Sequence, residues 1–306
     1  MNRPTRPLPR SLAALSFTQL LRRYPHHARM LLWLRSCWLI RREHLHALGW
    51  PHPSTRQNRN QGLRRLTAAG LIEPIDRDDQ VFKLGRSGAT ILQNYGLATP
   101  YRMTPKPSAR PGPLLAGEFA VALGLEVMQH PSILAMSWSE QPFAGSVVRP
   151  DASAALHYGI RPDATSDPWV DILKPGMSWP LAPHERTIQL FLEVDRVSQF
   201  STKIEERMRS WAAATRYPSH TQLPSQTVQL VLWVTTGTTR RVSTMRRLWN
   251  DSTRQRALFT TCDQLRREHA EPGAMSPLQA SWCTPGGQWI TGKELFPFAL
   301  NQTGRP

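Results

Sequence analysis

The chain has 306 residues, which is enough for one large domain or for two ordinary ones with separate cores. Hydrophobic residues make up 40% of it, which argues against a disordered chain, and no apolar run approaches the roughly 20 residues of a membrane-spanning helix. The 38 Lys and Arg residues outnumber the 22 Asp and Glu residues and give a formal net charge of +16, which predicts a polyanionic partner such as nucleic acid.

The cysteines and the N-terminus bear on cellular location. Cys37, Cys262 and Cys283 lie far apart in the sequence and form no CxxC pair, so neither a disulfide framework nor a zinc site is predicted. The first residues carry arginines but lack the apolar stretch and cleavage site that are typical of a secretory signal peptide. We therefore expect a soluble cytoplasmic protein that has no membrane partner.

Proline content predicts the domain boundaries. Residues 1–16 combine three prolines with three arginines, which predicts a flexible basic tail. Five prolines lie between residues 97 and 113, and this density disfavours helix and sheet interiors, so the segment is predicted to be a linker. Residues 17–96 and 114–300 are then expected to form the two domains of an α/β (α+β) protein.

Residues 17–96 have the predicted element order of a winged helix-turn-helix domain. Three helices are expected between residues 17 and 69, and the third would begin after Ser54, a good N-cap, and end before Gly70. An alternating segment at 71–84 predicts a β-hairpin that turns at 76–79. In winged-helix proteins the third helix enters the major groove of DNA, so this domain is predicted to bind double-stranded DNA.

The third predicted helix has a polar face that suits DNA. Leu63 and Leu66 are expected in the core, and the side chains opposite them are of the types that bond base edges and phosphates. The hairpin tip adds one arginine among three aspartates, a composition that also suits a protein partner. Two arginines that follow the strand at 227–235 are expected to contact backbone phosphates. The predicted DNA-binding residues are Arg56, Gln57, Asn60, Arg64, Arg77, Arg240 and Arg241.

Residues 114–300 alternate between predicted helices and strands. A helix is expected at 114–128, an amphipathic helix at 199–216, and two basic helices within 240–269. This order predicts a mixed sheet flanked by helices. The expected strands cover residues 133–138, 146–156, 187–195 and 227–235.

Carboxylates cluster at the ends of two of these predicted strands. Asp151 lies near the start of one strand, and Glu193 and Asp195 end another, on the same face because side chains alternate along a strand. Carboxylate oxygens at one sheet edge suit Mg²⁺ or Mn²⁺, and such a metal can activate water for attack on a phosphodiester. Lys203 on the following helix and Glu118 on the preceding one are further candidates. The sequence therefore predicts a metal site with Asp151, Glu193 and Glu118 as candidate ligands.

Two short motifs, followed by a lysine and a tyrosine, occur in an order along the chain that suggests a family. RPDA stands at residues 149–152 and LEVDR at residues 192–196, followed by Lys203 and Tyr217. With these motifs the chain resembles the PD-(D/E)xK superfamily, whose core is a helix, three strands, a helix and a strand. In particular it resembles the replication-relaxation family of plasmid and integrative-element proteins, and its architecture is similar to that of restriction-endonuclease-like relaxases, which nick transfer origins.

The resemblance implies a mobile-element protein that acts at a replication or transfer origin. A winged helix would select the DNA site, and the PD-(D/E)xK domain would nick or cleave DNA with Mg²⁺ or Mn²⁺. The metal would be bound by Asp151 and Glu193, and the implied catalytic residues are these two together with Asp195 and Lys203.

Two alternatives stay open. The tetrapeptide RPDA occurs again at 161–164, so Asp163 competes with Asp151, which is favoured because Val147 and Val148 lead into it. The second alternative concerns function: the protein would be a DNA-binding accessory factor or regulator without catalysis. Its nuclease-like domain would then mediate a homodimer or recruit replication, transposition or conjugation proteins.

Overall fold

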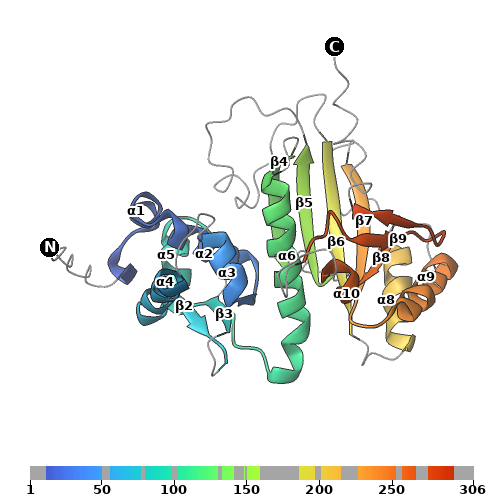
Figure 1. Cartoon of the computed structure of the whole chain (residues 1–306), viewed down its shortest axis with the longest axis horizontal. Helices are drawn as coiled ribbons and strands as arrows, with labels where there is room; N and C mark the ends of the chain where they lie inside the picture. Colours follow the sequence, from blue (N-terminus) through green and yellow to red (C-terminus); the bar gives the residue numbers. More distant parts are fainter. Residues whose placement is uncertain are drawn as a thin grey trace, which may run out of the picture. The chain divides into compact units, whose positions relative to one another are not determined.

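The computed structural model describes residues 12–49, 56–76, 80–97, 102–129, 133–140, 148, 150–158, 186–196, 201–214, 227–252, 257–266 and 275–292. The chain divides into two compact units, Met1–Gly117 and Glu118–Pro306. One unit carries a three-stranded sheet and the other a seven-stranded mixed sheet, and both contain helices (Figure 1). The predicted mixed α/β class is therefore confirmed.

Helices make up most of the first unit. Ser16 begins α1 with a capping box, because its hydroxyl accepts a hydrogen bond from the N–H of Gln19 while the Gln19 side chain accepts one from the N–H of Ser16. The helices are α1 (Phe17–Arg23), α2 (Pro25–Ser36), α3 (Arg42–Gly49), α4 (Arg56–Ala68) and α5 (Arg86–Asn94), with 3-10 helices η1 (Leu12–Ala14) and η2 (Pro107–Ala109).

The end of α4 lies where the sequence predicted it. Gly70 has a φ of 66°, a left-handed conformation that favours glycine. Its N–H donates to the carbonyl of Thr67 at 2.9 Å, and the N–H of Leu71 donates to the carbonyl of Leu66 at 3.0 Å, which together form a Schellman motif. The motif turns the chain from α4 directly into the strand that follows. The expected N-cap, Ser54, lies outside the described residues.

The small sheet contains the predicted hairpin. Its strand order is β1-β3-β2, with β2 (Ile72–Pro74) and β3 (Val81–Leu84) antiparallel and β1 (Ile40–Arg41) added at the other side of β3. The carboxylate of Asp76 accepts a hydrogen bond from the N–H of Gln80 at 2.8 Å and so stabilises the turn. The predicted DNA contact Arg77 lies outside the described residues.

Part of the predicted linker packs on the first unit. The Lys83 ammonium donates to the carbonyl of Arg102 at 3.3 Å, and the Trp38 indole donates to the carbonyl of Met103 at 3.2 Å. The next helix, α6, begins at Pro111, earlier than expected, because a proline in the first helical turn removes no intrahelical hydrogen bond. Arg102 and Met103 of the predicted linker are therefore held by hydrogen bonds from the first unit.

The second unit is built on a seven-stranded sheet. Its order is β10-β9-β8-β7-β6-β5-β4; β4, β5 and β6 are antiparallel, β6, β7 and β8 are parallel, and β9 and β10 return antiparallel. The strands are β4 (Ile133–Glu140), β5 (Ala152–Tyr158), β6 (Arg186–Asp195), β7 (Thr227–Thr235), β8 (Ala257–Thr261), β9 (Ser281–Cys283) and β10 (Trp289–Thr291). The helices are α6 (Pro111–Gln129), of which the residues from Glu118 belong to this unit, α8 (Ser201–Ala214), α9 (Thr239–Ser252) and α10 (Cys262–Arg266).

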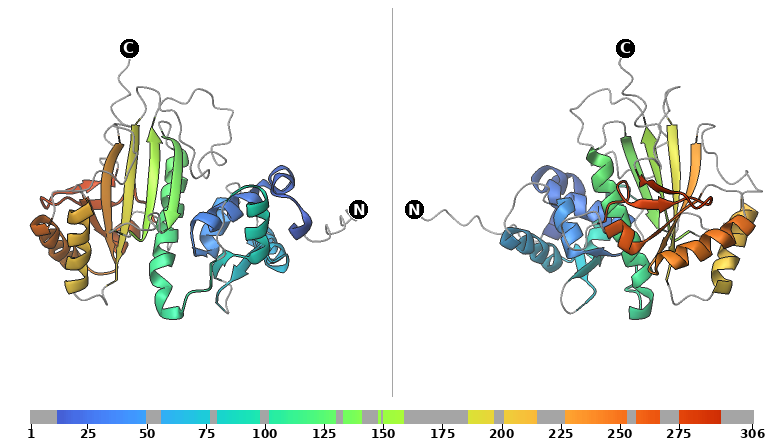
Figure 2. Two further views of the ribbon diagram at one scale, coloured as in Figure 1. Left: turned by 180° about the vertical axis from the view of Figure 1, so that it is seen from behind. Right: turned by 45° about the vertical axis from the view of Figure 1, so that its right-hand side comes forward.

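Helices cover both faces of this sheet, with α6 on one face and α8 and α9 on the other (Figures 1 and 2). The side chains of β6 alternate accordingly: Phe191 belongs to the core cluster with Trp211 of α8 and Trp249 of α9. On the opposite face Phe119 of α6 contacts the rings of Trp138 and Trp282, each at a centroid distance of 6.3 Å. The end of β6 is therefore enclosed on the side of α8 and α9.

Two strands differ from the prediction. Two helices, α9 and the short α10, lie in the region where two were expected, but the strand between them, β8 (Ala257–Thr261), was not predicted and is fully buried beside β7. The strand expected at 146–156 begins at Ala152, because Pro150 has no N–H to donate to the ladder. Among the described residues no helix is long and apolar enough to cross a membrane.

Candidate functional site

The predicted carboxylates Asp151 and Glu193 lie side by side at one end of β5 and β6. Ala152 pairs with Leu192 in the antiparallel register, which places the preceding Asp151 next to Glu193. The Asp151 carboxylate accepts a hydrogen bond from the N–H of Val194 at 2.8 Å. The backbone of β6 thus holds the Asp151 side chain over the end of the strand. Asp163, the alternative to Asp151, lies outside the described residues.

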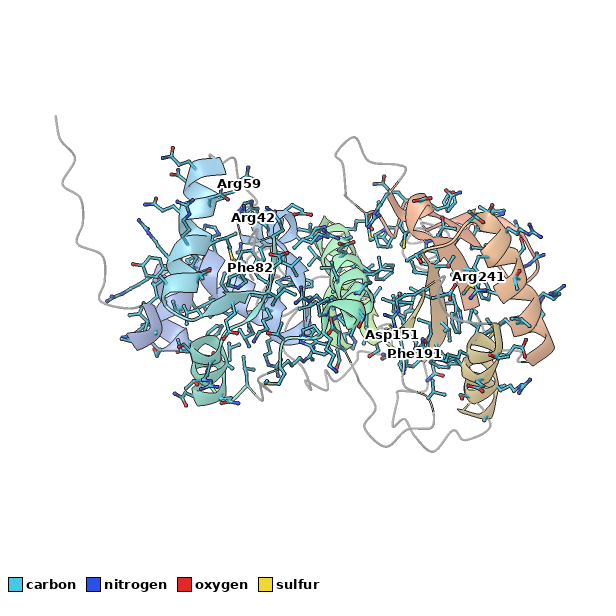
Figure 3. All side chains as sticks on the ribbon, turned by 90° about the horizontal axis from the view of Figure 1, so that it is seen from below. Arg42, Arg59, Phe82, Asp151, Phe191 and Arg241 are labelled. Atoms are coloured by element: carbon cyan, nitrogen blue, oxygen red, sulfur yellow. The ribbon has the colours of Figure 1, made fainter. Side chains whose placement is uncertain are left out.

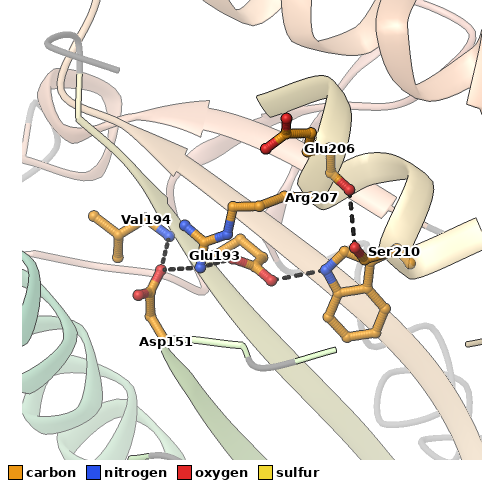
Figure 4. Close-up of polar contacts among 7 residues, drawn as sticks. Asp151, Glu193, Val194, Glu206, Arg207 and Ser210 are labelled. Carbon is orange, nitrogen blue, oxygen red and sulfur yellow. Dashed lines mark hydrogen bonds and ion pairs between the residues drawn. The ribbon is translucent and has the colours of Figure 1, made fainter. Parts of the chain in front are cut away.

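An arginine on α8 contacts both carboxylates. The terminal nitrogen Nη2 of Arg207 lies 2.6 Å from Oε2 of Glu193 and 3.1 Å from Oδ2 of Asp151 (Figure 4). The side chain of Glu193 is 1% exposed, whereas those of Arg207 and Asp151 are 28% and 34% exposed. One carboxylate is therefore buried, and the other two charged groups reach the surface.

Burial changes the acidity of Glu193. Desolvation raises the pKa of its carboxyl to about 8, and the negative charge of Asp151 acts in the same direction. Arg207 and the Trp211 indole, which donates to Oε1 of Glu193 at 2.7 Å, oppose this shift. Since the folded state favours the protonated form, Glu193 can carry a proton at neutral pH.

Asp195 ends β6 in a separate and closed network. Its side chain is fully buried and accepts two hydrogen bonds from Arg241 of α9, at 2.9 and 3.2 Å, and a third from the Thr235 hydroxyl at 2.7 Å. The hydrogen bond to Asp195 raises the pKa of Arg241. Because these bonds tie the end of β6 to β7 and α9, Asp195 acts on the site by holding the strand end in place.

Two further predicted site residues are not brought to the carboxylate pair. Lys203 is exposed on α8, one helical turn before Arg207. Glu118 on α6 is buried and forms an ion pair with Arg266 of α10 at 3.2 Å. Within the described part of the chain, no group of three or more His, Cys, Asp or Glu residues could hold a metal ion.

Arg207 and Trp211 are the site residues that the sequence prediction missed. The sequence predicted an amphipathic helix at 199–216 and singled out neither residue. The available signal was helical spacing, because residues 203, 207 and 211 follow one another at intervals of four and share one helix face. Only the depth of each residue against the sheet distinguishes Arg207 from Lys203.

The carboxylate pair has the chemistry of a site for a divalent metal. Oδ2 of Asp151 and Oε2 of Glu193 converge on a single atom, which is the arrangement that a bound cation requires. Carboxylate oxygens are the ligands that Mg²⁺ and Mn²⁺ prefer. Asp151 and Glu193 are therefore the two residues here that would hold a divalent metal.

The exposed face of α4 is the candidate nucleic-acid interface. Leu63 and Leu66 are buried against the rest of the unit, while Gln57 and Arg64 are exposed and Asn60 is half-buried. The backbone of Arg56 begins α4, but its side chain lies outside the described residues. Three of the four predicted residues on this helix thus lie on its outer side.

A hollow beside α4 brings in a further arginine. It has a volume of about 300 Å³, and Figure 3 shows two of its lining residues, Arg42 at the start of α3 and Phe82 of β3, next to α4. Asn60, Arg64 and Thr67 of α4 supply polar groups to it. The sequence prediction missed Arg42, which precedes α4 by a whole helix and is placed here by β1.

The two arginines predicted on α9 have different surroundings. Arg240 is exposed at the start of the helix, whereas Arg241 is held by Asp195. Neighbouring residues on a helix point about 100° apart, so only one of the two can face Asp195. Arg240 is therefore the one of the pair whose side chain is open to solvent.

Comparisons of the chain with family models, with curated proteins and with solved structures find no match. The resemblance to the replication-relaxation family stays a prediction from the motifs.

Proposed function

We propose that this protein binds double-stranded DNA and that its first unit is a winged helix-turn-helix with α4 in the major groove. The observation that carries the proposal is the division of α4 into a buried face with Leu63 and Leu66 and an outer face with Gln57, Asn60 and Arg64. The helices α2, α3 and α4 followed by the β2–β3 hairpin have the element order of this domain class, and α1 precedes them. The surplus of 38 basic over 22 acidic residues supplies the long-range attraction to DNA.

The residues on α4 divide into two roles in this proposal. Gln57 and Asn60 carry side-chain amides, which can form paired hydrogen bonds with adenine. Arg42 and Arg64 line one hollow, and their guanidinium groups suit a backbone phosphate. The first pair selects sequence, and the second adds affinity that depends on salt.

The test is fluorescence anisotropy with labelled duplex DNA from the region upstream of the protein's own gene, at several salt concentrations. Arg64→Ala is expected to lower affinity for this duplex and for a random duplex alike, and to reduce the salt slope by about 0.9. Arg22→Ala removes the same charge from the exposed end of α1 and is the matched control. Absence of binding by the unaltered protein, or equal effects of both variants, would contradict the proposal.

A second candidate function is metal-dependent nicking of DNA by the second unit, at a replication or transfer origin. The observation that favours it is the convergence of Asp151 and Glu193 on one cation position. The order α6-β4-β5-β6-α8-β7 matches the helix, three strands, helix and strand of a PD-(D/E)xK core. Asp151 and Glu193 would hold Mg²⁺ or Mn²⁺, which supplies an activated water and stabilises charge on the phosphodiester.

The chain's own residues would contribute in three ways. Trp211 fixes the orientation of the Glu193 carboxyl through its indole N–H. Asp195, through Arg241 and Thr235, keeps the end of β6 in place. Arg207 is a cation at the carboxylate pair that can bind the negative charge of a phosphate.

The nicking test uses supercoiled plasmid that carries the protein's upstream region, with Mg²⁺, Mn²⁺ or EDTA. We expect metal-dependent nicking by the unaltered protein and none by Glu193→Ala, with DNA affinity unchanged in the variant. No nicking by either protein, with DNA binding retained, would favour an accessory factor. Its second unit would then mediate a homodimer or recruit replication, transposition or conjugation proteins.

A further inference from the structure

We propose that Arg207 is a built-in competitor for the metal position, so that a divalent metal binds Asp151 and Glu193 only when the Arg207 guanidinium leaves. This inference rests on the proposed metal-dependent function of the pair. It assigns to Arg207 the control of metal affinity, which is a property separate from any contact with DNA.

The geometry makes the two cations mutually exclusive. One atom, Nη2 of Arg207, lies 2.6 Å from Oε2 of Glu193 and 3.1 Å from Oδ2 of Asp151. A magnesium ion ligated by oxygen lies about 2.1 Å from each ligand atom, so an ion that used both oxygens would overlap the volume of this nitrogen. Electrostatic repulsion between a dication and a guanidinium adds to the steric conflict.

The burial of Glu193 favours a positive charge beside it, and the partial exposure of Arg207 allows its side chain to move away. The Glu193 side chain is 1% exposed, and a buried carboxylate without a nearby positive charge is strongly disfavoured. The Arg207 side chain is 28% exposed and extends from α8, whose neighbouring residue Glu206 is exposed to solvent. Rotation of the arginine side chain can therefore carry the guanidinium from the pair to the surface.

The same helix provides a matched control. Arg209 lies two residues further along α8, is 71% exposed and pairs only weakly with Glu205, at 3.4 Å. Removing Arg209 changes the net charge of the protein as much as removing Arg207 does. A difference between the two variants therefore reports the position of the charge and not its amount.

The experiment is a titration of each protein with Mn²⁺, followed by isothermal calorimetry and by electron paramagnetic resonance of free Mn²⁺. The apparent affinity for Mn²⁺ is proportional to the fraction of the protein in which the carboxylate pair is open. If that fraction is below a tenth in the unaltered protein, Arg207→Gln is expected to raise the affinity about tenfold or more. Arg209→Gln is expected to change affinity less than threefold, and Arg207→Lys, which keeps a competing cation, is expected to remain closer to the unaltered protein.

The location of the bound ion is tested in the double variant Asp151→Asn/Arg207→Gln, which should lose the gain in affinity. If Arg207→Gln does not fold without metal, Mn²⁺ added during refolding is expected to restore the fold, measured by circular dichroism. Failure of Mn²⁺ to restore it would overturn the proposal.

Three outcomes of the titration also count against the proposal. Weaker Mn²⁺ binding in Arg207→Gln would make Arg207 an aid to the metal, and equal changes in both glutamine variants would reduce its role to net charge. If the unaltered protein binds Mn²⁺ at the pair and Arg207→Gln does not increase the affinity, this inference is overturned and the metal-dependent function stands. No Mn²⁺ binding by any variant would overturn both.

Discussion

Two acid–arginine clusters lie at the end of β6, two residues apart, and they differ in how completely each carboxylate is satisfied. Asp195 receives three hydrogen bonds, two from Arg241 and one from Thr235, and is fully buried. Glu193 shares Arg207 with Asp151. The same residue types therefore form a closed structural pair at one position and a pair that can exchange its cation at the other.

Acidity follows this difference. Burial dominates at Glu193 and raises the pKa of its carboxyl to about 8, so a proton can replace the positive charge of Arg207. The hydrogen bond from Arg241 to the Asp195 carboxylate raises the pKa of Arg241, so this guanidinium stays charged. A carboxyl that can change its partner is suited to binding and release, whereas one held by three bonds is suited to keeping a strand end in place.

The largest expected effect comes from breaking the closed cluster. Arg241→Ala leaves Asp195 buried without a counter-charge and is expected to lower the free energy of unfolding by about 3 kcal/mol, measured in urea at pH 7. Arg240→Ala, on the next residue but exposed, should stay within about 0.5 kcal/mol.

Arg207→Ala extends this comparison. Because Glu193 can take up a proton once the arginine is gone, the loss of stability at pH 7 should be smaller than for Arg241→Ala. Equal losses in the two variants would mean that the clusters do not differ as described.

A second, smaller effect is the pH dependence that Glu193 gives to stability. Its pKa is raised from 4.5 to about 8 in the folded protein, so its protonated form contributes stability that is fully present below pH 4.5 and is lost as the pH rises to about 8. Between pH 6 and pH 8 the loss is expected to be about 2 kcal/mol, at about 1.4 kcal/mol per unit of pH.

Glu193→Gln isolates this contribution. The neutral amide cannot ionise, so the decline in the free energy of unfolding between pH 6 and pH 8 should be smaller by that amount in the variant. Urea unfolding at both pH values measures it. Identical slopes in the two proteins would show that Glu193 does not change its protonation state between pH 6 and pH 8.

Local pattern was enough to predict several parts of the fold. The strongly apolar run before Glu193 predicted β6, and alternation along the strand placed Glu193 and Asp195 on one face, where Glu193 contacts α8 and Asp195 contacts α9. Gly70 marked the end of α4, because a glycine after a helix favours the left-handed conformation that a Schellman motif needs. These features depend on neighbouring residues alone.

Partners brought together by distant segments were beyond the sequence. Arg207 meets Asp151 only through the pairing of β5 with β6 and the depth of α8 against the sheet, and periodicity could not rank it above Lys203. Likewise the run of arginines after β7 could not show that Arg241 faces Asp195 while Arg240 faces solvent. The strand β8 was not predicted, because its burial comes from pairing with β7, where Ala257 lies opposite Val231, 26 residues earlier.

The smallest expected effect belongs to a third acid–arginine pair, on the surface of α8. This pair serves as a reference for the two clusters at the end of β6. Arg209 and Glu205 are spaced as residues i+4 and i, and the Arg209 side chain is 71% exposed. Water and salt screen such a pair, so Arg209→Ala is expected to lower the free energy of unfolding by at most about 0.5 kcal/mol, less still in 1 M salt. Urea unfolding at low and high salt measures this. A loss of stability as large as that of Arg241→Ala would show that α8 is stabilised by its surface charges. Burial of the carboxylate would then not explain why the clusters at the end of β6 differ from an ordinary surface ion pair.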